Sequence, residues 1–255
     1  MDTRFWGPSG WRLLHLITFA YEPAQKRAVE AMFEALPFVL PCKFCRASLT
    51  EYMEKDPPNY SSREKLSRWL WRIHNAVNAK LRGQGLLHDV DPSFDDVKKV
   101  YEERLAAGCL RTEFEGWDFL FSVAENHPCC AAARKSTPLP LATNATRKNP
   151  SYRNRENTMS SDERMKWYMK FWKNLGPSLP FAEWRESWAE CKMRLASLDT
   201  RKAWLRELWR IRSCMEDKLE LINREEFGSL CKRLANHRSG CGKKKRARTC
   251  RRART

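Results

Sequence analysis

The chain places its apolar residues at helical spacing, and residues 61–81 show this most clearly. The apolar positions there recur every three or four residues, at Leu66, Trp69, Leu70, Ile73, Val77 and Leu81. This period predicts an amphipathic helix, and Ser61 or Ser62 can cap its start. No stretch of the sequence shows the pattern that is typical of a strand. We therefore expect an all-α fold.

Three polar residues lie amid this apolar stripe, namely His74, Asn75 and Asn78. Asn is a mediocre helix former, so their presence beside a core-facing stripe needs a reason. One explanation is capping, or hydrogen bonding to a neighbouring turn. The other is a polar ligand that lies against the helix.

Similar spacing predicts helices along the rest of the chain. Residues 6–11 are predicted to form a turn that leads into a largely buried helix, and the next helix is expected to end at Pro37 and Pro41. Gly176-Pro177 is expected to interrupt a later helix, while Ser160–Glu163 and Asn223–Glu226 show capping-box patterns. The expected helices cover about residues 11–20, 24–38, 42–55, 62–81, 94–106, 117–124, 160–175, 181–198, 200–222 and 227–234.

Charge divides the chain of 255 residues, whose formal net charge is +17. Residues 1–130 hold 17 Lys and Arg against 18 Asp and Glu, whereas residues 131–255 hold 31 against 13. Residues 131–159 are polar, basic and without periodicity, which is typical of a linker. We therefore expect a domain over 1–130, a linker over 131–159, a Trp-rich basic helical domain over 160–237 and a disordered basic tail over 238–255.

Cys42 and Cys45 follow Pro41 at the start of a predicted helix. Proline suits the first turn of a helix, and the positive end of the helix dipole favours a thiolate there. A pair at this spacing can close a small disulfide that opens and re-forms easily. The same spacing also supplies half of many zinc sites. The pair alone therefore leaves redox chemistry and zinc binding both open.

Three motifs together decide between these two interpretations. They are Trp6-Gly7-Pro8-x-x-Trp11-x-x-x-His15, Pro41-Cys42-x-x-Cys45 and His74-Asn75-x-Val77-Asn78-x-Lys80-Leu81. In this order they resemble the Erv/ALR family of FAD-dependent sulfhydryl oxidases, over about residues 4–105. The resemblance favours redox chemistry over zinc and implies no metal site. It also implies a four-helix bundle with a short fifth helix, usually in a homodimer.

The resemblance also implies roles for individual residues. Trp11 and His15 would pack on FAD, His74, Asn75 and Asn78 would line it, and Lys80 would lie near its pyrophosphate, where a cation is favourable. The full set of implied FAD contacts is Gly7, Pro8, Trp11, His15, His74, Asn75, Val77, Asn78, Lys80 and Leu81.

Cys45 would lie next to the flavin ring and Cys42 further out, toward the substrate. Electrons would then pass from dithiols in protein substrates through Cys42–Cys45 and FAD to O2, which would release H2O2.

The sequence departs from the family pattern at two places. Cellular members often carry Phe-Asp-Cys after the fourth helix, whereas this chain has Phe94-Asp95-Asp96. Cys109 lies near the expected second cysteine, so the structural disulfide lacks one partner. Residues 82–92 also form an insertion between Lys80-Leu81 and Phe94.

The remaining cysteines leave alternatives open. A shuttle pair would relay electrons to Cys42–Cys45. The candidates are Cys129–Cys130 and Cys241 with Cys250, and the third alternative is that the chain has no such pair. Cys191, Cys214 and Cys231 fall within helical runs and are interpreted as core residues.

The second half of the chain suggests a partner. Its Trp residues are interpreted as core, with nucleic-acid stacking as the alternative. The polycationic tail, 238–255, has nine basic residues and no acid. Such a tail would bind nucleic acid or another polyanion in a salt-sensitive way, or act as a nuclear-localisation signal.

The N-terminus shows no targeting signal, and no apolar run is long enough to span a membrane. Together with the basic appendage, this resembles the branch of the family found in large cytoplasmic DNA viruses. That branch would act in the host cytoplasm or the virion, on disulfides of virion proteins. The rival hypothesis is a non-enzymatic helical protein that binds zinc and nucleic acid.

Overall fold

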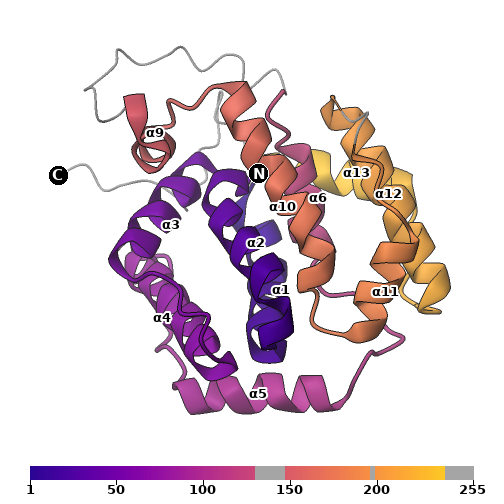
Figure 1. Ribbon diagram of the computed structural model, residues 1–255, viewed down its shortest axis with the longest axis horizontal. Coiled ribbons are helices and arrows are strands. Elements are labelled where there is room, and N and C mark those ends of the chain that lie inside the picture. The colour runs from indigo at the N-terminus through magenta and orange to yellow at the C-terminus, as the bar shows by residue number, and fades with distance from the viewer. Residues whose placement is uncertain (130–146, 196–198, 239–255) are drawn as a thin grey trace.

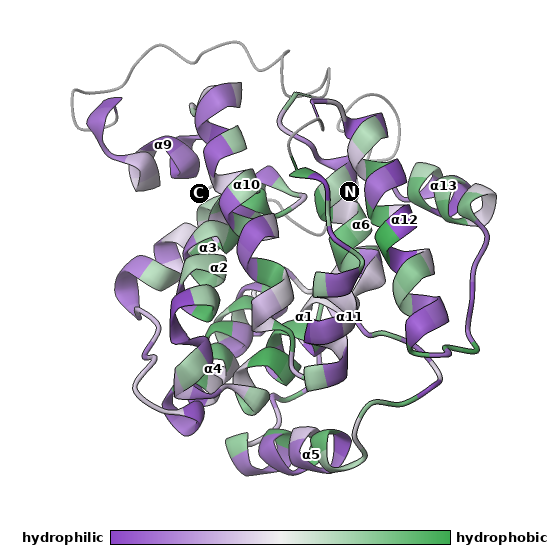
Figure 2. Cartoon of the chain, turned by 45° about the vertical axis from the view of Figure 1, so that its right-hand side comes forward, coloured by the Kyte–Doolittle hydropathy of each residue, from purple (hydrophilic) through white to green (hydrophobic). Residues whose placement is uncertain are grey.

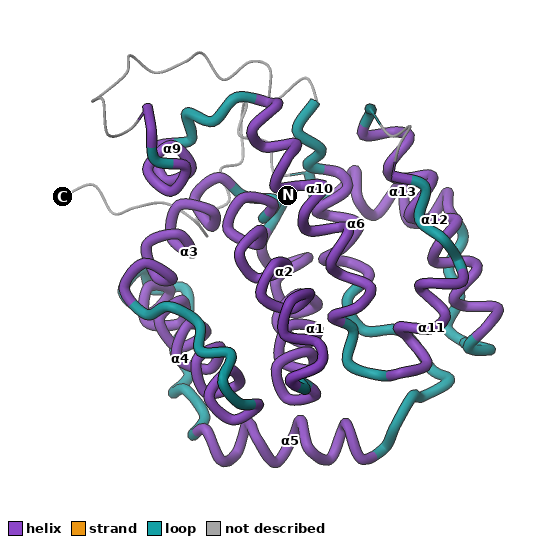
Figure 3. Tube along the Cα trace, viewed as in Figure 1, coloured by secondary structure: helices purple, strands orange, loops and turns teal. Residues whose placement is uncertain are grey.

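The computed structural model describes residues 1–129, 147–195 and 199–238, and every regular element in these ranges is a helix (Figures 1 and 3). The all-α prediction is therefore confirmed for this part of the chain. The α-helices are α1 Thr3–Ala20, α2 Lys26–Val39, α3 Lys43–Lys55, α4 Arg63–Arg82, α5 Phe94–Ala106, α6 Trp117–Glu125, α9 Pro150–Glu156, α10 Ser161–Ser178, α11 Ala182–Glu190, α12 Arg201–Lys218 and α13 Phe227–Asn236. A short 3₁₀ turn, η1 Pro23–Gln25, precedes α2.

The first helix begins earlier than its sequence indicates. Asp2 caps α1 by accepting a hydrogen bond from the Arg4 backbone N–H at 3.0 Å. The predicted turn at residues 6–11 is wrong, because this stretch, including Pro8, lies inside the helix. Pro8 removes one backbone hydrogen bond, but the helix also buries Trp6 to 8 % exposure. Tertiary packing therefore overrides a local helix-breaking signal.

Helix α10 also continues through a predicted break. It passes Gly176 and Pro177 and ends at Ser178. A Cβ added at Gly176 would lie only 2.3 Å from a ring carbon of Trp188. The glycine therefore lets α11 pack closely against α10 rather than ending the helix.

Two further local predictions differ from the structure. The capping box expected at 223–226 is wrong, because Glu226 caps α13 without a side-chain hydrogen bond. Helix α11 ends at Glu190, well before the expected end at residue 198. In contrast, Ser62 caps α4 and the Ser160–Glu163 capping box is present, as predicted.

Helix α1 lies at the centre of the packing. It contacts α4, α5 and α6, while α2 contacts α3 on one side and α10 on the other (Figure 1). Apolar faces of these helices turn inward (Figure 2), where the largest fully buried side chains are Trp69, Trp172, Trp184, Trp204, Tyr21, Tyr168, Phe33, Phe119, Phe121, Phe171, Leu13 and Leu16. Within the described residues, no helix is both long and apolar enough to cross a membrane.

The helices of the second half pack directly on those of the first. The rings of Trp167 in α10 and Phe38 in α2 stack at 4.1 Å between centroids. Lys170 forms an ion pair with Glu34 on the same two helices. Helix α9 lies within the predicted linker, so the expectation that residues 131–159 lack regular structure is wrong for residues 150–156. The division into domains stays a prediction, since residues 130–146 lie outside the described ranges.

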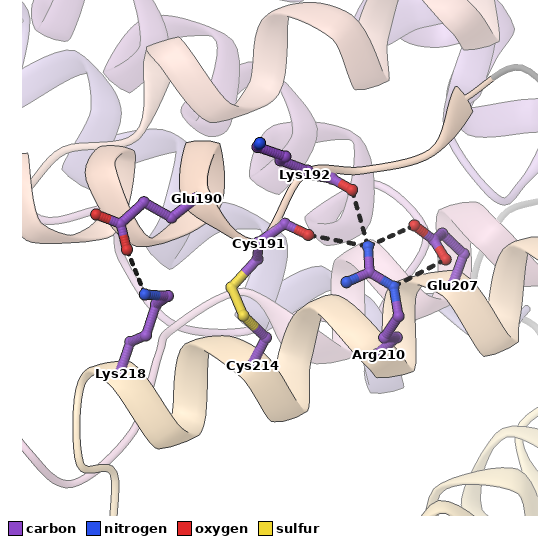
Figure 4. Close-up of a disulfide and its surroundings, with 7 residues drawn as sticks. All are labelled: Glu190, Cys191, Lys192, Glu207, Arg210, Cys214 and Lys218. Atoms are coloured by element: carbon purple, nitrogen blue, oxygen red, sulfur yellow. Dashed lines mark hydrogen bonds and ion pairs between the residues drawn. A yellow bond between two sulfur atoms is a disulfide. The ribbon is translucent and has the colours of Figure 1, made fainter.

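A disulfide joins the end of α11 to α12 (Figure 4). It links Cys191 to Cys214, whose Cα atoms are 6.0 Å apart. The sequence predicted Cys191, Cys214 and Cys231 as core residues. Cys191 is 3 % exposed, whereas Cys214 and Cys231 are only half-buried, and the pairing of Cys191 with Cys214 was not predicted. Arg210 reinforces the junction by donating to the Cys191 carbonyl at 2.9 Å and to the Lys192 carbonyl at 2.8 Å (Figure 4).

Candidate active site

A cavity of about 690 Å³ opens between the helices of the first half. That volume is suited to a large organic ligand. Most of its surface is apolar, with polar groups from α1, α3, α4 and α5. The lining residues that carry polar or aromatic groups include Thr3, Arg4, Trp6, Trp11, Arg12, Cys45, Ser48, Tyr52, Trp69, His74, Asn78, Lys80 and Tyr101.

One wall of the cavity is a stack of aromatic rings. Trp11 of α1 stacks on His74 of α4 with ring centroids 3.9 Å apart and an angle of 10° between the planes. Behind them, His15 Nε2 and His74 Nδ1 are 3.1 Å apart, within hydrogen-bonding distance. The sequence predicted that Trp11 and His15 share a face of one helix, because they are four residues apart. The structure places His74 against that face.

Burial keeps both histidines neutral. Desolvation lowers the pKa of His15 to about 3 and that of His74 to about 4. Among the described residues, His15 Nδ1 is buried without a hydrogen-bond partner. A bare buried acceptor is less costly than an orphaned N–H, which favours donation from His15 Nε2 to His74 Nδ1. His74 then carries its own proton on Nε2.

The two cysteines differ in position. Cys42 is the N-cap residue of α3, and its carbonyl accepts the first helical hydrogen bond, from the Arg46 N–H at 3.0 Å. Cys45 follows in the first turn of α3 and lines the cavity, whereas Cys42 does not. Both are half-buried. Both cysteines therefore lie at the N-terminus of α3, where the helix dipole is positive, and only Cys45 borders the cavity.

The insertion over 82–92 folds back onto α4. Asp91 accepts a hydrogen bond from Asn78 Nδ2 at 2.7 Å and pairs with Arg82. The hydrogen bond from Arg82 holds the pKa of the Asp91 carboxyl below its usual range. Leu86 of the same segment lines the cavity. The insertion thus contributes to the cavity wall, and it orients Asn78.

Three cationic side chains, from α1 and from the last turn of α4, line the cavity. Lys80 lines it and donates from Nζ to Ser48 Oγ on α3 at 2.8 Å. Arg4 and Arg12 of α1 also line the cavity, although Arg4 is paired with Asp2. A ligand that carries phosphates would find these groups favourable.

The predicted contact residues separate into two groups. Those that line the cavity are Gly7, Pro8, Trp11, His74, Val77, Asn78, Lys80 and Leu81. His15 lies behind Trp11 and His74, as their ring contacts indicate, and the half-buried Asn75 is not part of the lining.

Other site residues were not predicted. Tyr101 of α5 lines the cavity and stacks on His15 at 5.1 Å, and burial raises its pKa to about 12. Tyr52 and Ser48 of α3 also contribute. The helical period of α5 and α3 predicts their buried faces but does not mark these residues as ligand contacts.

The cavity fits a flavin dinucleotide on the evidence of its own residues. Trp6 and Trp11 add aromatic surface to the lining. The flat aromatic wall suits a planar ring system, and Lys80 and Arg12 suit phosphates. No group of three or more His, Cys, Asp or Glu in the described ranges is arranged to hold a metal ion.

Comparison with known proteins places this site in a family. The sequence profile of the Erv1 / Alr family matches residues 8–102, which includes α2, α3, α4 and most of α1 and α5. No solved structure matches the chain.

The chain is similar to proteins from viruses and from yeast. It is 34% identical over 120 residues to the FAD-linked sulfhydryl oxidase of African swine fever virus (isolate Pig/Kenya/KEN-50/1950), a match that covers 45% of this chain and 92% of that protein. The mitochondrial FAD-linked sulfhydryl oxidase of Saccharomyces cerevisiae is 35% identical over 86 residues, or 32% of this chain and 45% of that protein. A probable FAD-linked sulfhydryl oxidase of Acanthamoeba polyphaga mimivirus is 33% identical over 85 residues, or 31% and 59%.

The viral match spans nearly the whole of the African swine fever virus protein, and the profile match contains the paired cysteines, the two histidines and the cavity wall between them. This chain therefore belongs to the Erv1 / Alr family.

Proposed function

We propose that this chain is an FAD-linked sulfhydryl oxidase that forms disulfides in thiol-containing protein substrates, with O2 as the electron acceptor. One observation carries the proposal: Cys45 lines a large aromatic cavity, while its partner Cys42 lies outside that lining at the start of the same helix. This arrangement separates a sulfur that faces the cofactor from a sulfur that faces substrate.

The two cysteines perform the exchange with substrate. A substrate thiolate attacks Cys42 Sγ and forms a mixed disulfide, which breaks the bond between Cys42 and Cys45. A second substrate thiol then attacks the mixed disulfide. The substrate leaves oxidised, and Cys42 and Cys45 remain as a dithiol. The N-terminus of α3 stabilises the thiolates that form during these steps.

A bound FAD would supply the two-electron redox chemistry that links the dithiol to O2. The surrounding residues bind and orient it. Trp11 presents an aromatic face, the neutral His74 offers an N–H, and Lys80 supplies a positive charge. His15 holds the His74 ring in place from behind. The apolar remainder of the lining limits access of water.

The proposal extends to partners and location, with support from the comparisons and the charge of the chain. Several of the similar proteins are viral, so the proposal includes virion proteins as substrates, in the host cytoplasm or the virion. The basic tail, residues 238–255, would bind nucleic acid or another polyanion, and the protein would act as a homodimer. Residues 239–255, which include Cys241 and Cys250, and Cys130 lie outside the described ranges, so a shuttle role for them stays a prediction.

Oxygen uptake with a small dithiol tests the function. We expect the wild-type protein to consume O2 when dithiothreitol is added, and Cys45→Ser and Cys42→Ser each to reduce this rate at least about 100-fold, since a single sulfur cannot complete the exchange. Cys231→Ser is the matched control, because Cys231 is half-buried in α13, which does not line the cavity. Equal rates for the wild type and Cys45→Ser would contradict the proposal.

A further inference from the structure

The turn that carries Cys42 and Cys45 is held by two hydrogen bonds to a single backbone carbonyl. We call residues 40–46 the redox turn, which joins the end of α2 to the first turn of α3. The Leu40 carbonyl accepts a hydrogen bond from Arg46 Nη1 at 2.9 Å and another from Asn126 Nδ2 at 3.4 Å. Arg46 follows Cys45 directly, and its side chain therefore folds back across the turn to a point two residues before Cys42.

A segment far along the chain holds this arginine. Asn157, at the end of α9, accepts a hydrogen bond through Oδ1 from Arg46 Nη2 at 3.4 Å. Asn157 has a φ of 56°, a left-handed conformation that Asn tolerates better than most residues. The backbone of Asn157 therefore ends α9, while its side chain reaches the redox turn.

Helix α9 is itself fixed to both helices that flank the turn. Asn154 is 3 % exposed, and its Nδ2 donates to the Pro37 carbonyl of α2 at 3.1 Å and to Thr50 Oγ1 of α3 at 2.6 Å. Figure 1 shows α9 beside α3. This helix lies beyond residues 8–102, the range of the family match. The redox turn of this chain is thus braced by a segment that the family profile does not include.

Arg46 brings a permanent positive charge to the redox turn. Its side chain is 9 % exposed, and a guanidinium stays protonated at any working pH. Arg46 follows Cys45 in the chain and its guanidinium binds the carbonyl two residues before Cys42, so the charge lies on the same short turn as both cysteines. A nearby arginine stabilises a thiolate. Stabilising the reduced form of a dithiol pair makes the corresponding disulfide a stronger oxidant.

We propose that Arg46, held by Asn157 of the α9 segment, is a positioning residue that makes the Cys42–Cys45 disulfide a stronger oxidant of substrate thiols. The proposal rests on the proposed thiol oxidation at this pair. In the exchange that measures it, two glutathione molecules reduce the pair: the Cys42–Cys45 bond breaks, the bond of oxidised glutathione forms, and the two thiol protons of glutathione pass to Cys42 and Cys45.

Equilibration of the full chain with glutathione tests the proposal. We expect Arg46→Met to lower the equilibrium constant for reduction of the pair about tenfold, which corresponds to about 30 mV. It should also shift the midpoint of the pH dependence of Cys42 alkylation by iodoacetamide upward. Arg46→Lys keeps the charge and should recover most of both effects. Asn157→Ala leaves Arg46 in place but frees its side chain, and should give a shift between wild type and Arg46→Met.

Arg155→Ala is the matched control, because Arg155 also lies on α9 but pairs with Glu54 rather than reaching the redox turn. We expect it to match the wild type in both measurements. Unchanged constants and midpoints in both Arg46→Met and Asn157→Ala would overturn the proposal, as would an equal shift in Arg155→Ala. A wild-type pair that does not exchange with glutathione at all would overturn the proposed function as well.

Discussion

The His15–His74 pair is a buried polar element of the site. Its two rings lie within hydrogen-bonding distance, between Trp11 on one side and Tyr101 on the other. Both rings are neutral because burial lowers the pKa of each well below 6.5. The protonation state of this pair therefore affects both the cavity wall and the stability of the fold.

This coupling predicts a loss of stability in acid. The unfolded chain takes up protons on His15 below about pH 6.5, while the folded chain does so only near its depressed pKa of about 3. The contribution is fully present above pH 6.5 and is lost as the pH falls toward the folded-state pKa of about 3, at up to about 1.4 kcal/mol per pH unit.

Urea unfolding between pH 7 and pH 4.5 measures this contribution. His15→Gln should be less stable than the wild type at pH 7 but should lose less unfolding free energy as the pH falls. His88→Gln is the control, since His88 is exposed in the insertion, and should keep the wild-type slope. Identical slopes for the wild type and His15→Gln would show that His15 is not buried as a neutral ring.

Some site residues could be predicted from the sequence and others could not. Trp11, His15 and His74 were found because the family motifs contain them and because helical spacing places the first two on one face. Tyr101 lines the cavity only through the packing of α5 on α1. Arg46 meets Asn157 across more than a hundred residues of chain. No local pattern encodes such contacts.

At the scale of whole elements, apolar periodicity predicts where most helices lie, and its errors have physical causes. The expected range of α5, 94–106, agrees with the structure because Ser93 and Asp96 form a capping box at its start. Pro8 and Pro177 are strong local breakers, yet both lie within helices. In these places the burial of neighbouring aromatic rings outweighs the lost backbone hydrogen bond.

The disulfide between α11 and α12 gives a prediction at this scale. Its cysteines are 23 residues apart in sequence, and closing a loop of about that length stabilises a fold by about 3 kcal/mol. Replacing Cys191 and Cys214 together by Ala should therefore lower the free energy of unfolding by about that amount. Oxygen uptake per folded molecule should not change, because neither residue lines the cavity.

Denaturant unfolding and oxygen uptake measured on one preparation check both halves of this prediction. Cys231→Ala serves as the control for loss of a half-buried cysteine without loss of a disulfide. A double variant that keeps full stability would contradict the structural role of the bond.

At the scale of the whole molecule, helices beyond the family match pack against the helices that line the cavity. Helix α6 reaches the lining through Phe119, whereas the described residues of α9 to α13 are not part of it. Helix α10 covers α2, α12 contacts α6, and α9 braces α3. The sequence predicts the helical character of this second half from its Trp spacing. It does not predict which catalytic helix each of these elements covers, since that depends on contacts between distant segments.

The central claim is that the cavity holds FAD within reach of Cys45. Anaerobic titration of the purified chain with dithiothreitol, followed by visible absorption, tests it most directly. The wild type should show a flavin band that dithiol bleaches, and Cys45→Ser should show a flavin band that persists under the same titration. A wild-type chain that shows no flavin band even after incubation with FAD, or a band that dithiol does not bleach, would contradict it.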